Sequence, residues 1–413
     1  MHITRRQFLR SIAILPAAAA LPGPLLRGMF APAGAGPRNL VLVDLKGGND
    51  GLNMVVPFGV DGGNYYSVFR PTLGIPQGSV LPLSGTVGLN GTMTALKAHF
   101  DAGRLAIVQG VGYPNPSFSH DVAQTIWQTG NTAGGSSVGW LARYLQQLGS
   151  QPSPNAVAVS DTLTLLLSES GTFVPAFTSL GDFTFPSDGN HDEDKQNRRN
   201  AYAAVAAGLS AAPSVDVANI AGTEGSILDL IDLFHTLPGF ASVGAYPPQT
   251  SLSNALKLTA KLLHSNIGMR YFHLPYGGFD THADQEKDGY HSKRVGIVSD
   301  ALAAFHADLT AIGIADDTLV VVFSEFGRTV YENGSGGSDH GYVNPVLVLG
   351  NGVVGGLTTA HPSLDPANLT TDGEPPMVAD FRDVFGTLVA NWLGGDAAAC
   401  FPGWTVSPVP FLA

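Results

Sequence analysis

Residues 318–341 read TLVVVFSEFGRTVYENGSGGSDHG, and this stretch decides the fold. Its first six residues are apolar or β-branched, which is typical of a strand buried on both faces of a parallel sheet. Functional groups in such sheets gather beyond the carboxyl ends of the strands, and Glu325 lies just past this end. Glycine and serine residues at 334–338 allow the chain to turn, so we expect Asp339 and His340 to return to the same edge.

Two more apolar stretches are predicted to be strands of the same sheet. They comprise residues 39–45, which read NLVLVDL, and residues 104–110, which read RLAIVQG. Before the predicted strand at 318–323, apolar residues recur every three or four positions from 295 to 312, the pattern of an amphipathic helix. Strands that alternate with helices predict an α/β fold. We expect a three-layer α/β/α sandwich with a mostly parallel central sheet and right-handed crossovers.

The remaining stretches are assigned within one domain. We expect residues 37–413 to form a single domain, because no linker divides them. A dense charged run opens what we interpret as a helical insertion at about 186–245. Residues 155–167, rich in Val, Thr and Leu, are expected to be extended, and a closing helix is expected at 380–393, where Gly394 would end it.

Residues 1–36 have the features of a twin-arginine export signal. Adjacent arginines in MHITRRQFLRS precede an apolar, alanine-rich stretch from Ile12 to Leu26. That stretch is short and interrupted by prolines, so no stable membrane span is expected. The signal predicts a periplasmic or secreted protein whose partner during export is the twin-arginine machinery. The alternative is a basic N-terminal arm on a cytoplasmic protein.

The composition excludes some partners and some kinds of site. The 413 residues carry 33 Asp and Glu against 21 Lys and Arg, a formal net charge of −12. An extended phosphate backbone would be repelled, so nucleic acid is not an expected partner. The single cysteine, Cys400, can form neither an intramolecular disulfide bond nor a zinc–thiolate cluster.

Further polar groups follow predicted strands and suggest a metal site. Asp50 lies in the glycine-containing turn after the 39–45 strand, with Asp44 inside that strand as a weaker candidate. Asp280 and His282 lie in a loop that begins with two glycines and follows the apolar run MRYFHL. Oxygen and imidazole ligands suit Zn²⁺, Mn²⁺ and similar ions. The predicted ligands of one or two divalent ions, with Zn, Mn, Ca and Mg all open, are Asp50, Asp280, His282, Glu325, Asp339 and His340.

A serine at the start of a predicted helix is the candidate nucleophile. Ser119 is the first choice and Ser117 the second, because a hydroxyl at a helix start meets free amides and the positive end of the helix dipole. A bound metal ion can turn such a hydroxyl into a nucleophile. His120 would be a ligand or would orient the serine, and Arg328 or Lys46 would hold an ester oxygen.

Each of these assignments has an ordinary structural alternative. Ser119 could be only an N-cap, and the acidic residues could be turn residues. Glu325 could form a salt bridge with Arg328. Histidines without acidic neighbours are expected to be structural, namely His264, His273, His291, His306 and His361.

The chain resembles the exported uncharacterised-domain family 1501, which is itself similar to the alkaline phosphatase and sulfatase superfamily. The motifs that carry the resemblance are LKGGNDGLN at 45–53, SHD at 119–121, GGFDTH at 277–282, SEFGRT at 324–329, SDHG at 338–341 and DFRDVFGTLVANWLG at 380–394. The resemblance implies an alkaline-phosphatase-like fold. It places the metal-binding and nucleophile roles on Asp50, Ser119, Asp280, His282, Glu325, Asp339 and His340. One departure is Glu325-Phe326, where many superfamily members have Asp-His.

Three functions are compatible with these observations. The leading hypothesis is an exported metal-dependent hydrolase of phosphate or sulfate esters, acting on a small-molecule or glycan ester. The second is a cell-envelope binding or assembly protein that retains the fold without catalysis. The third is a metal hydrolase of another ester or an amide bond, in which Ser119 only caps its helix.

Overall fold

The computed structural model describes residues 37–62, 64–149, 155–169, 173–182, 192–209 and 226–412. The predicted export signal lies outside these residues. Within them, no helix has both the length and the apolar character that crossing a membrane requires. Two helical stretches, α8 (Asp192–Leu209) and residues 226–235, fall in the predicted insertion. That the insertion is a separate addition to the domain stays a prediction.

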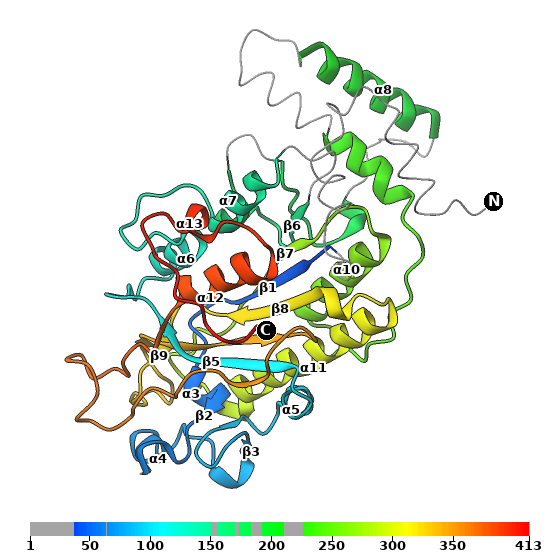
Figure 1. The fold of residues 1–413 in the computed structure, drawn as a ribbon. Helices are drawn as coiled ribbons and strands as arrows, with labels where there is room; N and C mark the ends of the chain where they lie inside the picture. Colours follow the sequence, from blue (N-terminus) through cyan, green and yellow to red (C-terminus); the bar gives the residue numbers. More distant parts are fainter. Residues whose placement is uncertain are drawn as a thin grey trace, which may run out of the picture.

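A sheet of eight described strands forms the centre of the protein (Figure 1). In spatial order the strands are β12 (Gly356–Leu357), β5 (Leu105–Gly112), β11 (Asn344–Leu349), β8 (Thr318–Phe323), β1 (Asn39–Leu45), β7 (Tyr271–Tyr276) and β6 (Ala156–Ala158), and β13 (Ala379–Asp380) also pairs with β5. Among these described strands, β11 alone runs antiparallel to its neighbours. The predicted mostly parallel sheet is therefore confirmed.

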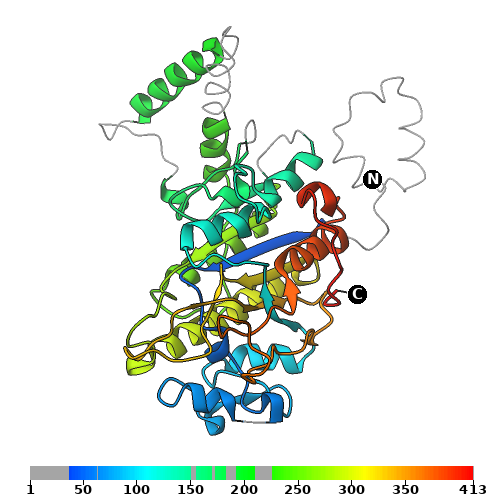
Figure 2. The same cartoon turned by 90° about the vertical axis from the view of Figure 1, so that its left-hand side faces the viewer.

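Helices cover both faces of this sheet, as Figures 1 and 2 show. One face carries α5 (Thr94–Asp101), α10 (Ser251–Ser265) and α11 (Tyr290–Ala311), and the other carries α6 (His120–Thr129), α7 (Trp140–Gln147), α12 (Phe381–Thr387) and α13 (Ala397–Cys400). Side chains of a strand alternate between faces, so Val41 and Val43 of β1 pack in the first layer, whereas Leu40 and Leu42 pack in the second. The three-layer α/β/α sandwich is confirmed.

Smaller elements complete the description. They are α3 (Gly51–Met54), α4 (Tyr65–Phe69), a small sheet of β2 (Val55–Val56), β4 (Gly88–Leu89) and β3 (Leu81–Pro82), and a ladder of β9 (Gly327–Arg328) with β10 (His340–Gly341). Short 3₁₀ turns occur at Val60–Gly62, Gln77–Ser79, Leu165–Leu167, Leu180–Asp182, Lys287–Gly289 and Ala315–Asp317.

The predicted strands agree with the observed ones where the apolar run is unbroken. Both β1 and β8 have the predicted bounds, and β5 is shifted by one to two residues. The prediction for 155–167 is wrong beyond β6, because Leu166 and Leu167 are buried from a 3₁₀ turn, with the Leu166 amide bonded to Gln128 of α6. β11 was not predicted at all.

Three helices compare with the predictions as follows. α6 begins and ends as expected, with Ser119 at its N-cap and Gly130 at its C-cap in the left-handed conformation, φ 72°. α11 begins five residues earlier than predicted. The closing helix follows Asp380, which caps α12, and continues as a π-helical turn at Leu388–Trp392 before Gly394 ends it at φ 68°.

A buried carboxylate on α11 anchors the chain that leads into α10. Asp308 is 1% exposed and accepts hydrogen bonds from the Ser242 hydroxyl (2.8 Å), the Val243 and Gly244 amides (2.7 and 2.9 Å) and the Tyr246 hydroxyl (2.8 Å). Replacing Asp308 with alanine leaves these donors without their acceptor, so we expect the free energy of unfolding to fall by about 3 kcal/mol.

Urea unfolding measures this effect. Asp300→Ala, an exposed position on the same helix, is the control and is expected to change stability by no more than about 0.5 kcal/mol. Equal losses in the two variants would contradict the anchoring role of Asp308.

Candidate metal centre

Four parallel strands deliver the predicted site residues to one edge of the sheet. β5, β8, β1 and β7 run in the same direction, so their carboxyl ends meet there. α6 begins after β5, a glycine-rich turn follows β1, an Asp/His loop follows β7, and the β9–β10 ladder follows β8. The residues that these segments carry to the edge are Ser119, His120, Asp280, His282, Glu325, Arg328, Asp339 and His340.

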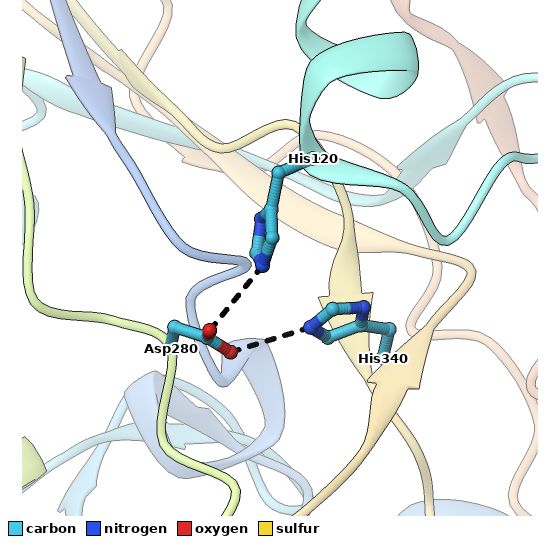
Figure 3. A group of neighbouring side chains, drawn as sticks. All are labelled: His120, Asp280 and His340. Carbon is cyan, nitrogen blue, oxygen red and sulfur yellow. Dashed lines mark hydrogen bonds and ion pairs between the residues drawn. The ribbon is translucent and has the colours of Figure 1, made fainter.

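The carboxylate of Asp280 is the centre of the arrangement. Its Oδ2 lies 3.4 Å from Nε2 of His120, and its Oδ1 lies 3.2 Å from Nε2 of His282 and 3.3 Å from Nε2 of His340. Figure 3 shows His120 and His340 pointing at this carboxylate from two different elements, α6 and β10. His120, Asp280 and His340 each offer one ligand atom within 4.8 Å of the others.

Each of the three rings presents its other nitrogen to an oxygen acceptor. The contacts of Nδ1 are His120 to Oε1 of Glu325 (2.9 Å), His282 to Oδ1 of Asp339 (2.9 Å) and His340 to the carbonyl oxygen of Phe118 (2.7 Å). Because each partner is an acceptor, Nδ1 carries the proton in the neutral ring and Nε2 carries the lone pair. Partners of this kind orient histidine ligands in metal sites.

The contact between His282 and His340 is the most informative one. Their Nε2 atoms are 2.9 Å apart. With both Nδ1 atoms protonated, two lone pairs face each other, which is repulsive unless a proton or a cation lies between them. Burial lowers the pKa of His340, which disfavours an extra proton on that ring. Ligand atoms about 2.0–2.1 Å from a tetrahedral ion are about 3.3 Å apart, close to the separations around Asp280. The donor set therefore fits a divalent ion.

Arg328 forms an ion pair with Asp280. Its Nη2 donates to Oδ1 of Asp280 at 2.7 Å, and the guanidinium also donates to the carbonyl oxygens of Gly47, Gly48, Phe279 and Ser338. Burial alone would raise the pKa of Asp280, but the hydrogen bond from Arg328 and its charge lower it to about 2. The Arg328 side chain is 0% exposed. The structure therefore does not offer Arg328 to an ester oxygen, because the guanidinium is enclosed by protein acceptors.

Glu325 lies behind His120. Its Oε1 accepts from His120 and from the Gly47 amide (2.9 Å), and its Oε2 accepts from the Ser324 hydroxyl (3.0 Å). Burial raises the pKa of Glu325, but the bond from His120 and the others outweigh it, so the net shift is downward. The ion pair considered between Glu325 and Arg328 is not formed. The structure groups Glu325 and Asp339 with the histidines, as acceptors for their Nδ1 atoms.

Asp50 is not brought into this group. It caps α3 by accepting from the Leu52 and Asn53 amides, and its Oδ2 lies 2.6 Å from Nη1 of Arg70. Both side chains of this ion pair are 0% exposed. The turn after β1 thus uses its acidic residue as a helix cap and as the partner of a buried arginine. Asp44 is also apart, 3.5 Å from Nε2 of His273.

A residue that sequence reasoning missed joins the two loops that carry candidate ligands. Gln285 is fully buried, and its Oε1 accepts from the hydroxyls of Thr281 (2.9 Å) and Ser338 (2.7 Å). Its Nε2 donates to Asp50. The loops touch closely at Gly337, where an added Cβ would lie 2.4 Å from the Thr281 carbonyl oxygen. Glutamine in a polar loop carries no sequence signal for such a role.

The serines lie at the start of α6. Ser119 is exposed, and within the described part of the chain its hydroxyl does not cap the helix that it precedes. The Ser117 hydroxyl instead accepts from the Ser119 amide at 3.2 Å. Lys46 follows β1 directly and is half-buried. Its ammonium has no hydrogen-bond or ion-pair partner among the described residues.

Comparison with protein families matches most of the sheet and the candidate site. A family model described as "Protein of unknown function (DUF1501)" matches residues 108–381. Those residues include the histidines, Asp280 and the β9–β10 ladder, whereas Asp50 lies outside the match. A search of curated proteins finds no match.

Several solved structures are similar at low identity. The C-terminal periplasmic domain of EcEptC from Escherichia coli, in complex with Zn, is 13% identical, with 77% of this chain and 74% of that one covered and a TM-score of 0.36. The PsFucS1 sulfatase from Pseudoalteromonas sp. is 11% identical, with 90% and 70% covered and a TM-score of 0.38. A protein in the alkaline phosphatase superfamily from Vibrio parahaemolyticus is 11% identical, with 88% and 70% covered and a TM-score of 0.37.

Proposed function

The chain belongs to the family described as proteins of unknown function (DUF1501), so an activity has to be inferred from the site, and we propose a metal-dependent hydrolase of phosphate or sulfate esters. The observation that carries the proposal is the set of three Nε2 lone pairs directed at the carboxylate of Asp280, each ring held by an acceptor at Nδ1. The lone pairs and the carboxylate repel one another unless a cation lies between them, and we therefore infer that the site binds a cation.

The proposed ligands are His120, Asp280, His282 and His340. Three imidazoles and one carboxylate favour Zn²⁺ or Mn²⁺ over Ca²⁺ and Mg²⁺, which prefer oxygen ligands. A bound divalent ion would supply positive charge for an ester oxygen and would lower the pKa of a hydroxyl beside it. The sequence left His120 open as a ligand or as a residue that orients the serine, and we propose it as a ligand. Glu325 and Asp339 were predicted ligands, and we propose instead that they accept from Nδ1 of His120 and His282 and so orient these rings.

Ser119 is the proposed nucleophile. It directly precedes the ligand His120, and its exposed hydroxyl stands at the N-terminus of a ten-residue helix. The first amides of a helix have no partner within it and favour an anionic group there. The serine oxygen would bond to phosphorus or sulfur as the bond to the leaving oxygen breaks and its own proton departs, and water would later release the group. Lys46, with its unpaired ammonium, is the proposed second contact for an ester oxygen.

We also propose that the protein acts after export, on a small-molecule or glycan ester. The support is the twin-arginine pattern within residues 1–36. A reporter fused behind these residues, with Arg5 and Arg6 replaced by lysines as the control, tests the route. Equal export with and without the arginines would contradict it.

Ser119→Ala tests the nucleophile. We expect kcat on any phosphate or sulfate ester that the wild type hydrolyses to fall at least about a thousandfold, because the attacking oxygen is removed. Ion content, measured by elemental analysis, should stay at the wild-type ratio. Ser117→Ala is the matched control, two residues earlier in the same loop, and should keep most of the activity.

The other outcomes separate the remaining hypotheses. Full activity of Ser119→Ala with the ion retained would contradict the serine mechanism and favour attack by water, as in a hydrolase of another bond. A stoichiometric ion with no hydrolysis in a broad ester screen would favour the non-catalytic binding protein. Absence of any ion from protein refolded with Zn²⁺ or Mn²⁺ would contradict the proposed function as a whole.

A further inference from the structure

A hollow with a volume of about 590 Å³ adjoins the metal centre. It lies between the loop that follows β7 and the first turns of α11, and we call it the α11 hollow. Asp280, the residue at the centre of the three histidines, forms part of its wall. A substrate whose reacting group sits on the metal centre therefore has room to extend into the α11 hollow. Its lining includes Asp280, Thr281, Lys287, Tyr290, Lys293 and Arg294.

The charge of this lining differs from that of the chain. Three of the 21 Lys and Arg residues line the α11 hollow of a protein whose net charge is −12. Three acids, Asp280, Asp284 and Asp288, also line it, so the formal charges of the lining balance, whereas the chain as a whole is acidic. Attraction of an anion therefore depends on which of the three cations are available to it, because a charge-assisted hydrogen bond needs a donor that is not already engaged.

Lys293 is the cation most available to a ligand. It is exposed, and among the described residues its ammonium has neither a hydrogen-bond nor an ion-pair partner. Lys287, by contrast, lies 3.4 Å from Asp284, but both side chains are 67% exposed. An ion pair so exposed is weak, and an incoming anion can compete for the lysine.

Arg294 is fixed in place beside these lysines. Its guanidinium carbon lies 4.8 Å from the ring centre of Tyr276 and 5.4 Å from that of Tyr290, and it donates to the Gly277 carbonyl oxygen. Gly278 has a positive φ of 95°, and a Cβ there would lie 2.4 Å from the guanidinium carbon. The glycine pair of the loop therefore makes room for a cation that is already ordered before a ligand arrives, which limits the entropy lost on binding.

We propose that the α11 hollow binds a negatively charged substituent of the substrate beyond the reacting ester group, with Lys293 as its main contact. This inference rests on the proposed function, because it assumes that an ester occupies the metal centre. It names the substrate class: esters that carry a second anionic group, such as a carboxylate, phosphate or sulfate. Tyr290, with 43% of its surface exposed, adds an aromatic face for the body of the molecule.

Two phosphonates that cannot be hydrolysed test the proposal. Propylphosphonate and 3-phosphonopropionate share the phosphonate, but only the second carries an additional carboxylate. Calorimetric titration of the ion-loaded full chain is expected to give about tenfold tighter binding of 3-phosphonopropionate, a preference that shrinks as salt rises. Lys293→Glu is expected to abolish the preference, and Lys293→Ala to reduce it.

Lys261→Glu is the matched control. It makes the same charge change on α10, whose residues do not line the α11 hollow, so the tenfold preference should persist. Equal affinity for the two phosphonates in the wild type, no binding of either, or an unchanged preference in Lys293→Glu would each overturn the proposal. Because binding is measured without turnover, these results are distinct from failure of the proposed function, which shows as a missing ion or missing hydrolysis.

Discussion

Asp280→Asn is expected to lower the affinity of the protein for Zn²⁺ or Mn²⁺ at least about a hundredfold. Loss of partners that only orient ligands costs about 10- to 100-fold in metal sites. Asp280 is expected to matter at least as much, because among the described residues its carboxylate is the one in contact with all three Nε2 atoms. The asparagine keeps the size of the side chain and can still accept from Arg328, so the fold should persist. Titration of chelator-treated protein with each ion measures the change.

Thermal unfolding with and without the ion gives a second readout. At an ion concentration of 100 times Kd, bound ion stabilises the wild type by about 2.7 kcal/mol, and this gain should nearly vanish in Asp280→Asn. Asp284→Asn is the control, an exposed acid in the same loop whose partner is Lys287. If Asp280→Asn bound the ion as tightly as Asp284→Asn does, the metal centre would have to lie elsewhere.

Arg70→Met is expected to lower the free energy of unfolding by about 3–5 kcal/mol. It leaves Asp50 charged, fully buried and without its arginine, and the loss of one partner of a buried pair has a cost of this size. Arg70 also donates to the carbonyl oxygens of Thr329 and Val330, so the segment that directly follows β9 loses contacts too. Urea unfolding measures the change, and Asp50→Asn in the same chain should recover part of it.

The effect of Arg70→Met should depend on pH. Burial raises the pKa of Asp50, but the charge of Arg70 and the bonds that Asp50 accepts hold the net value below its ordinary one. An aspartate in the unfolded chain has a pKa near 3.9. Because the pKa of Asp50 is lower in the folded protein, its ionised form stabilises the fold above that pH, and this stabilisation is lost as the pH falls through the folded pKa. Without Arg70 burial is the larger effect, so Asp50 takes up a proton more readily and the variant should lose less stability on acidification.

An exposed ion pair provides the control for Arg70→Met. Lys97 lies 2.7 Å from Asp101 on α5, with side chains 24% and 58% exposed. Lys97→Met should cost less than about 1 kcal/mol. If the two methionine variants were equally stable at pH 7, the buried pair would not be the anchor that its geometry indicates.

The elements that could be predicted are those whose burial leaves a pattern in the chain. The runs at 39–45 and 318–323 are apolar on both faces, and both became central strands. Gly130 marked the end of α6 because it adopts a positive φ, which glycine tolerates best. β11 was missed for two reasons. Its apolar run comes soon after a glycine-rich stretch that was interpreted as a loop. It is also antiparallel to its neighbours, so the strand–helix–strand alternation used to predict the other strands does not precede it.

For the candidate site, the structure brings most of the predicted segments together but places some of the predicted residues elsewhere. The motifs that follow β5, β7 and β8 do meet around Asp280. Asp50 was assigned to the same site from its position after a strand, yet it pairs with Arg70, twenty residues later in a segment without a recognisable motif. Arg328 was assigned to the substrate, yet its donors are used by carbonyl oxygens that no sequence pattern could place beside it.

The sequence by itself determined the class of fold and which segments carry the candidate site residues, because strand burial, helix periodicity and glycine turns are local properties of the chain. Tertiary structure alone decided which atom of each side chain faces which partner. The Nδ1 contacts of the histidines join residues up to 222 positions apart, and a difference of a few ångströms separates a ligand from the acceptor behind it. Local pattern cannot set such distances, because they depend on how closely the loops pack at the edge of the sheet.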